Sequence, residues 1–181
     1  MHHGLNIIIF ISSICLIGIP AGLCQEEDYT EMPEPMSIFE YFADAEWICE
    51  SQWSSGNPFK GRMVYEWGLG GKILHAYSYD TGAEGEYLRY ESILTWHPLR
   101  EEFRVYGFGS DGSVGEASVE HPNEETFIIT SIPDEISTEP AIRQYIEIVD
   151  HDSFNWTVSM EIDDGWQEII QGIYNRQIHP R

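Results

Sequence analysis

The sequence predicts an all-β protein: a single antiparallel β-barrel of about ten meander strands, with a short helix before the first strand. Apolar and polar residues alternate along most of the chain from Trp47 onward, and turn residues separate these runs at the spacing of hairpins. No helical period longer than two turns appears among the runs. An open meander would leave two exposed edges, and closure into a barrel removes both. A two-layer sandwich remains the alternative.

The N-terminal segment has the features of an export signal. An almost wholly apolar run covers residues 7–19, which is the length of a signal-peptide core and too short to span a bilayer. Gly22 and Cys24 place small residues before Gln25, so we predict a signal peptide over residues 1–24. Cleavage after Ala21 and an uncleaved membrane anchor are the alternatives. We therefore expect a secreted or periplasmic protein with no membrane span after cleavage.

A leader and a short helix precede the strands. Residues 25–35 are acidic, carry two prolines and predict a flexible leader, so the barrel domain is expected over residues 36–178. Ser37 and Glu40 have the spacing of a capping box, which predicts a helix start. The apolar side chains from Ile38 to Ala45 then form one stripe over two turns. A helix of this kind would cover one end of the barrel.

Ten runs carry strand signals, and the clearest alternation lies in the ninth. Asp-Gly pairs at 111–112 and 164–165 favour tight hairpins, because glycine accepts a positive φ without steric cost. Other turn signals lie at 70–71, 81–82, 97–98 and 121–123. The predicted strands cover residues 46–54, 61–69, 71–80, 87–97, 101–109, 113–120, 124–132, 141–150, 153–161 and 166–176.

Charge and cysteine content exclude several function classes. The chain has 31 acidic and nine basic residues and a net charge of −22, so it would repel nucleic acid, and we expect no nucleic-acid partner. After cleavage at residue 24, Cys49 would be the only cysteine, which allows neither an intramolecular disulfide nor a thiolate zinc cluster. Earlier cleavage would let Cys24 bond to Cys49. No metal site and no cofactor is predicted.

The chain from about Ile38 to Arg176 resembles the bacterial family catalogued as domain of unknown function 1579. The shared elements are a short helix before a strand with Trp47, and the segments 67–72, 94–98, 150–154, 164–165 and 174–176. The resemblance implies a calycin-like (lipocalin-like) barrel. It implies no substrate, because the family has no settled biochemical role.

The aromatic content, at 13%, is high for a domain of this size. In a barrel such rings either fill the interior or line a cavity for one small ligand. Trp47, Trp53, Tyr65 and Phe154 belong with the rings expected to face inward, and plain core packing is the alternative for each of them. The predicted ligand-binding residues are Trp67, His75, Tyr77, Tyr90, Trp96, Phe103, Arg143 and Trp156.

Two of these residues are polar candidates whose role depends on which face of their strand points inward. His75 is in phase with Ile73 and Tyr77, and on an inward face it could orient a ligand. Arg143 is in phase with Tyr145, and it could clamp a ligand carboxylate or stack on an aromatic ring.

No catalytic motif is present: the sequence has no nucleophile elbow, no zinc-protease helix and no phosphate-binding glycine loop. The expected function is therefore that of an exported barrel that binds a small hydrophobic or amphipathic ligand. The alternatives are a small barrel enzyme, such as an isomerase, cyclase or hydrolase, and an acidic interaction module for a basic partner.

Overall fold

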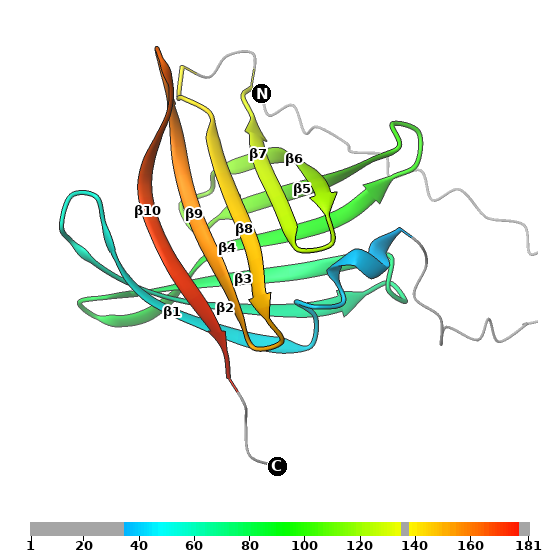
Figure 1. The fold of residues 1–181 in the computed structure, drawn as a ribbon, viewed down its shortest axis with the longest axis horizontal. Coiled ribbons are helices and arrows are strands. Elements are labelled where there is room, and N and C mark those ends of the chain that lie inside the picture. Colours follow the sequence, from blue (N-terminus) through cyan, green and yellow to red (C-terminus); the bar gives the residue numbers. More distant parts are fainter. Residues whose placement is uncertain (1–34, 135–137, 178–181) are drawn as a thin grey trace, which may run out of the picture.

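Ten antiparallel strands close into one barrel in the computed structural model, which describes residues 35–134 and 138–177 (Figure 1). Each strand pairs with its neighbours in sequence, and β1 pairs with β10 to complete the ring. The elements are η1 (Met36–Phe39), β1 (Ala45–Trp53), β2 (Pro58–Gly68), β3 (Ile73–Gly82), β4 (Gly85–His97), β5 (Glu102–Gly109), β6 (Val114–Asn123), β7 (Thr126–Ile132), β8 (Ile142–Asp150), β9 (Ser153–Ile162) and β10 (Gly165–Arg176). The predicted all-β barrel of about ten meander strands is confirmed, and the sandwich alternative is excluded.

The predicted signal peptide and nearly all of the predicted leader lie outside the described residues. In the described part of the chain, no helix is long and apolar enough to cross a membrane.

Strand boundaries agree with the sequence prediction to within a few residues, with one informative exception. The turn predicted at residues 121–123 lies two residues later, because β6 continues to Asn123, which pairs with Thr126. The register shifts between Glu120 and Asn123. Pro122 lies inside this irregular segment, where a residue without an N–H group interrupts no regular ladder bond.

The predicted helix is shorter than expected, and its capping box does not form. η1 is a single 3-10 turn that follows Pro35, and no side chain caps its start. The Glu40 backbone N–H donates to the Ser37 carbonyl oxygen instead. Burial explains the tight turn, because it directs the Phe39 and Phe42 rings together into the barrel.

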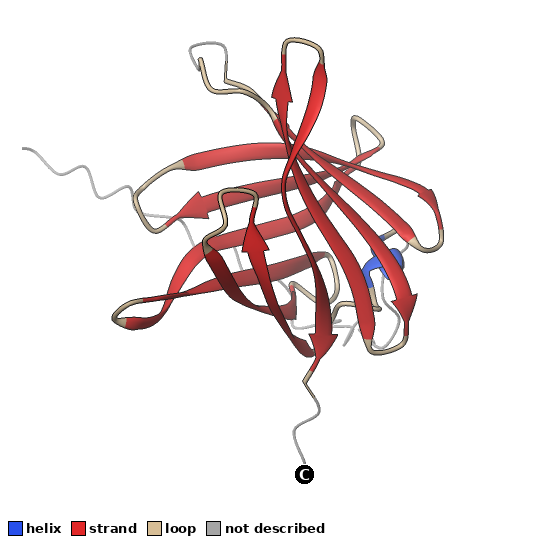
Figure 2. Cartoon of the chain, turned by 60° about the vertical axis from the view of Figure 1, so that its left-hand side comes forward, coloured by secondary structure: helices blue, strands red, loops and turns tan. Residues whose placement is uncertain are grey.

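These two rings close one end of the barrel. Phe39 contacts Phe103 on β5 and Phe127 on β7, with ring centroids 5.3 and 5.6 Å apart. Phe42 contacts Tyr65 on β2 and Phe154 on β9, each at 5.5 Å. We call this end, with η1 and the β2–β3, β4–β5, β6–β7 and β8–β9 turns, the closed end. Figure 2 shows the helix seated at this end of the strands.

The alternation of each strand sets an inner and an outer face. Trp47 and Cys49 on β1 are fully buried and face inward, and the antiparallel register carries that assignment from strand to strand around the ring. The opposite end, with the β1–β2, β3–β4, β5–β6 and β9–β10 turns and the β7–β8 connection, is called the open end. The half of the interior next to it is the open half.

Candidate functional site

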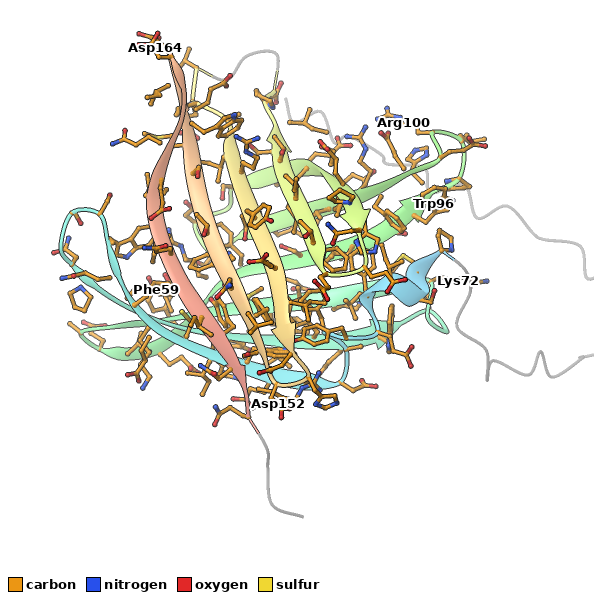
Figure 3. All side chains as sticks on the ribbon, in the orientation of Figure 1. Phe59, Lys72, Trp96, Arg100, Asp152 and Asp164 are labelled. Atoms are coloured by element: carbon orange, nitrogen blue, oxygen red, sulfur yellow. The ribbon has the colours of Figure 1, made fainter. Side chains whose placement is uncertain are left out.

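Three predicted residues face inward near the closed end. Trp96 and Phe103 make an edge-to-face contact at 4.8 Å, and Phe103 in turn contacts Phe39. Trp67 lies opposite the fully buried Leu74 and packs against the same core. Figure 3 shows Trp96 beside η1, whereas Phe59 lies in another part of the barrel. These rings belong to the packing of the closed end, and their role in ligand binding stays a prediction.

Three other predicted residues face outward, so their expected inward orientation is wrong. On β3 the buried residues are Leu74 and Ala76, which places His75 and Tyr77 on the outer surface. His75 Nδ1 lies 3.7 Å from the Glu91 carboxylate there, and its ring stacks on Tyr77 at 6.0 Å. The prediction placed the strand face with the larger rings inward, but the smaller residues of β3 face the interior.

Arg143 also lies on the outer surface, because its neighbours Ile142 and Gln144 belong to the inner face of β8. Its guanidinium carbon lies 3.9 Å from the centre of the Trp166 ring. Of the two roles considered for Arg143, stacking on an aromatic ring is the one observed, and its place on the outer surface contradicts a carboxylate clamp inside the barrel.

The remaining two predicted residues, Tyr90 and Trp156, face the open half. Tyr90 pairs with Ser78 on β3, and 41% of its surface is exposed. Trp156 pairs with Ile146 and Gly172 on the inner faces of β8 and β10. Its Nε1 donates a 2.9 Å hydrogen bond to Oε1 of Gln144. The indole is therefore held in a fixed orientation with its ring in the interior.

Solvent reaches the inner wall of the open half. Val105 and Ile129 face inward, yet both are only partly buried, whereas the inward-facing rings of the closed end, such as Phe127 and Phe154, are buried almost completely. The same partial exposure continues across one wall of the barrel. Its members are Ser78, Ser92, Val105, Gly107, Ala117, Ile129, Ser131 and Gln144, which we call the open wall.

Gly107 of the open wall, and its register partner Gly115 at the exposed rim of β6, show where this wall is not covered by side chains. A Cβ atom at Gly115 would meet no atom within 4 Å, and one at Gly107 would meet only the Ser92 hydroxyl, at 3.5 Å. Neither glycine has a positive φ that would forbid a side chain. Solvent-accessible space therefore lies in front of the half-buried Gly107, and it is continuous with the exposed rim at Gly115.

The facing side of the interior is aromatic and packed. Phe59 stacks on Trp156 at 5.5 Å, and Trp156 contacts Tyr174 edge-to-face at 5.5 Å. A Cβ atom at Gly61 would lie 2.5 Å from Cζ of Phe59 and 2.9 Å from the Tyr174 hydroxyl. We call this side, formed by the inner faces of β9, β10, β1 and β2, the packed wall. The open half thus places an aromatic surface opposite small and hydroxyl-bearing side chains.

A charged pair lies where β3 and β4 approach the open end. Asp80 on β3 is the register partner of the inward-facing Gly61 on β2, and 14% of the Asp80 side chain is exposed. Arg89 Nη1 donates to Asp80 Oδ2 at 2.5 Å, close to a shift in register between β3 and β4. The guanidinium also lies 5.2 Å from the Tyr90 ring centre. Within the described residues, Arg89 is the only lysine or arginine that faces the open half.

The Tyr174 ring is buried, and its hydroxyl makes no hydrogen bond to other described residues. This oxygen is not one of the side-chain atoms that are buried without a partner, so solvent reaches it. Burial raises the pKa of this phenol, and the charges of Cys49, Tyr65 and Asp80 act in the same direction. The hydroxyl therefore stays protonated and can donate one hydrogen bond.

Sequence reasoning missed Phe59, Asp80, Arg89, Tyr174 and Gly107. Asp80 could have been found, because it is in phase with Leu74 and Ala76 on the less aromatic face of its strand. Arg89 could not, because it lies next to a register shift that no periodicity reveals.

Other chemistry is not assembled in the described part of the chain. No group of three or more His, Cys, Asp or Glu side chains there could hold a metal ion. Of the described histidines, none faces the open half: His121 stacks on Phe127 towards the closed end, and His75 is on the outer surface. A histidine general base in the open half is therefore not supported.

No family model and no curated protein matches this chain. Solved structures with a similar fold include the S-type phycobiliprotein lyase CPES from Guillardia theta, with 10% identity and a TM-score of 0.48 over 80% of this chain and 92% of that one. A de novo designed fluorescence-activating beta barrel has 15% identity and a TM-score of 0.37, covering 76% of this chain and 95% of the design. These likenesses are too distant to carry a functional inference, and membership of the family noted above stays a prediction.

Proposed function

We propose that this protein is an exported carrier or receptor for a small, largely apolar ligand that binds in the open half of the barrel. The single observation that carries the proposal is the solvent-accessible space in front of Gly107 and the partly exposed inner wall around it, in a barrel whose other end is filled. A protein that needed only stability would fill that volume, because interiors normally pack to the density of organic crystals.

The chemistry of the two walls supports the ligand class. Phe59 and Trp156 offer an aromatic surface to an apolar body. Ser78 and Ser92, on the open wall, offer hydroxyl groups that make no hydrogen bond to other described residues. A mixed lining of this kind suits a guest with an apolar body and a few polar groups.

The test is a binding titration with phenylnaphthylamine, a neutral probe that fluoresces in apolar sites. We expect saturable binding to the purified barrel domain and loss of binding in the Gly107→Phe variant, whose new ring would occupy the volume. Val114→Phe is the matched control, because it adds the same ring to a residue that is 75% exposed on the outer face of β6. Equal binding by both variants, or none by the wild type, would overturn the proposal.

Export is the second part of the proposal, and the apolar run over residues 7–19 supports it. Expression of the full chain with its N-terminal segment should release a protein whose first residue is Gln25. Intact-mass measurement of the released form checks this, and a mass that retains residues 1–24 would contradict it.

A further inference from the structure

The open half contains a polar corner that the apolar part of the proposed site does not use. The Asp80–Arg89 pair lies one strand away from Gly61, where the Tyr174 hydroxyl lies, at the edge of the packed wall. The Tyr174 oxygen lies 2.9 Å from the position of a Gly61 Cβ, and Gly61 is the register partner of Asp80. Gly61 thus leaves the space that the Phe59 ring and the Tyr174 hydroxyl occupy, one strand away from Asp80.

The corner has unused hydrogen-bonding capacity. Asp80 Oδ2 accepts from Arg89, but Oδ1 accepts nothing from the described residues. The Tyr174 hydroxyl is likewise without a partner within residues 35–134 and 138–177, in a side chain that is 98% removed from solvent. Neither oxygen is one of the side-chain atoms that are buried without a partner, so solvent or a ligand can reach both of them.

Charge decides which ligand group fits the corner. Arg89 is already neutralised by Asp80, and its positive charge also lowers the pKa of Asp111, after the larger effect of the Ser113 hydrogen bonds. Acidic residues surround the open end, whereas the open half of the interior holds only that one cation among the described residues. The acidic residues of this end include Glu84, Asp111, Asp134, Glu139, Glu161, Asp163 and Asp164. This field attracts a cation and repels a carboxylate.

We infer that the ligand is a cationic amphipath whose protonated amine binds Asp80 Oδ1 beside the Tyr174 hydroxyl, while its apolar body lies between Trp156 and the open wall. The inference rests on the proposed function, since it names the polar end of the same ligand. Arg89 competes with the amine in this arrangement: its hydrogen bond occupies Oδ2 of Asp80 and leaves only the other oxygen for the amine.

The experiment compares three probes that share one alkyl tail: decylamine, decanol and decanoate, each displacing phenylnaphthylamine at neutral pH. We expect decylamine to displace the dye at the lowest concentration, decanol at an intermediate one and decanoate at the highest. In Asp80→Asn, decylamine should weaken by about tenfold, because a charge-assisted hydrogen bond of about 1.5 kcal/mol or more is lost, while decanol changes little.

The matched control is Glu50→Gln, which removes one carboxylate from an exposed ion pair with Lys60 on the outer face. It lowers the net negative charge by the same amount as Asp80→Asn, so equal weakening of decylamine in both variants would overturn the inference. Asp80→Asn leaves Arg89 without its partner and could fail to fold. In that case Arg89→Met tests the inference, because it keeps Asp80 and removes the competing cation. Decylamine should bind more tightly to this variant than to the wild type.

The outcomes separate the two proposals. If decanoate displaces the dye as well as decylamine does, the amine inference fails and the proposed function stands. If phenylnaphthylamine does not bind or no probe displaces it, the proposed function itself fails. Tyr174→Phe tests the hydroxyl: it should weaken decylamine and decanol by a similar few-fold factor, consistent with one neutral hydrogen bond of about 1 kcal/mol. No change for either probe would remove Tyr174 from the site.

Discussion

Glycines on the two sides of the barrel interior differ in what surrounds them. Gly61 and Gly172, on the packed wall, make room for neighbouring side chains: a Cβ at either position would lie 2.5 Å from the Phe59 ring or from the Cys49 sulfur. Gly107, on the open wall, and Gly115, at the exposed rim of β6, have no such neighbours. A small inward-facing residue can therefore either make room for neighbouring side chains or leave space uncovered. Only the residues opposite it determine which.

The largest expected effect contrasts the closed end with the open half. Trp47 is fully buried, contacts Phe154 at 4.9 Å and donates from Nε1 to the Phe42 carbonyl oxygen. Trp47→Ala should lower the free energy of unfolding by about 3–5 kcal/mol. Val105→Ala, in the partly exposed open wall, should cost about 1 kcal/mol, because that side chain is only partly buried. Urea denaturation followed by circular dichroism measures both. Equal costs would mean that the open half is as tightly packed as the closed end.

The packed wall should not tolerate an added methyl group. In Gly172→Ala the new Cβ would overlap the Cys49 sulfur and press on Ser51 Cβ at 3.1 Å, which should cost about 1–3 kcal/mol. Adding Cys49→Ala should recover part of that loss, since it removes the overlapping sulfur. A comparison of unfolding midpoints for the single and double variants checks this. If the double variant showed no recovery, the contact with Cys49 would not be the cause.

Alkaline pH should destabilise the packed wall through Cys49. Burial raises the pKa of this thiol from an ordinary value of 9.0 to about 11, opposed by a smaller effect of the Ile173 backbone hydrogen bond. The unfolded chain therefore loses the thiol proton at a lower pH than the folded chain does, and stability falls as pH rises through this window. Wild type should lose about 1 kcal/mol more than Cys49→Ala between the two pKa values, given partial solvation. Parallel stability profiles for the two proteins would contradict the assignment.

The smallest effect is expected at Gly107. Gly107→Ala places a methyl group 3.5 Å from the Ser92 hydroxyl, which is an ordinary contact, so the unfolding free energy should change by less than about 1 kcal/mol. Thermal unfolding of this variant beside Gly172→Ala makes the comparison direct. A large loss at Gly107 would show that the open wall has no room.

Much of the fold was predictable because strand periodicity is a local property. The alternation of Phe154, Trp156 and Val158 on β9 indicates which residues share a face, and the hairpin turns indicate which strands are neighbours. The candidate site was predicted only in part. Tyr90 and Trp156 do face the open half, but the choice of His75 and Tyr77 followed ring size rather than orientation.

By itself, the sequence determined the all-β class, the order of ten antiparallel strands and the aromatic closed end, since each of these follows from alternation, turn residues or one apolar stripe. The tertiary structure alone decided which face of β3 points inward. A period of two divides a strand into two equal faces, and only pairing with β2 and β4 around a closed ring selects one of them. Closure likewise brought the Tyr174 hydroxyl of β10 to Gly61 of β2, one strand away from the Asp80–Arg89 pair, because proximity across a barrel depends on register and not on separation in the chain.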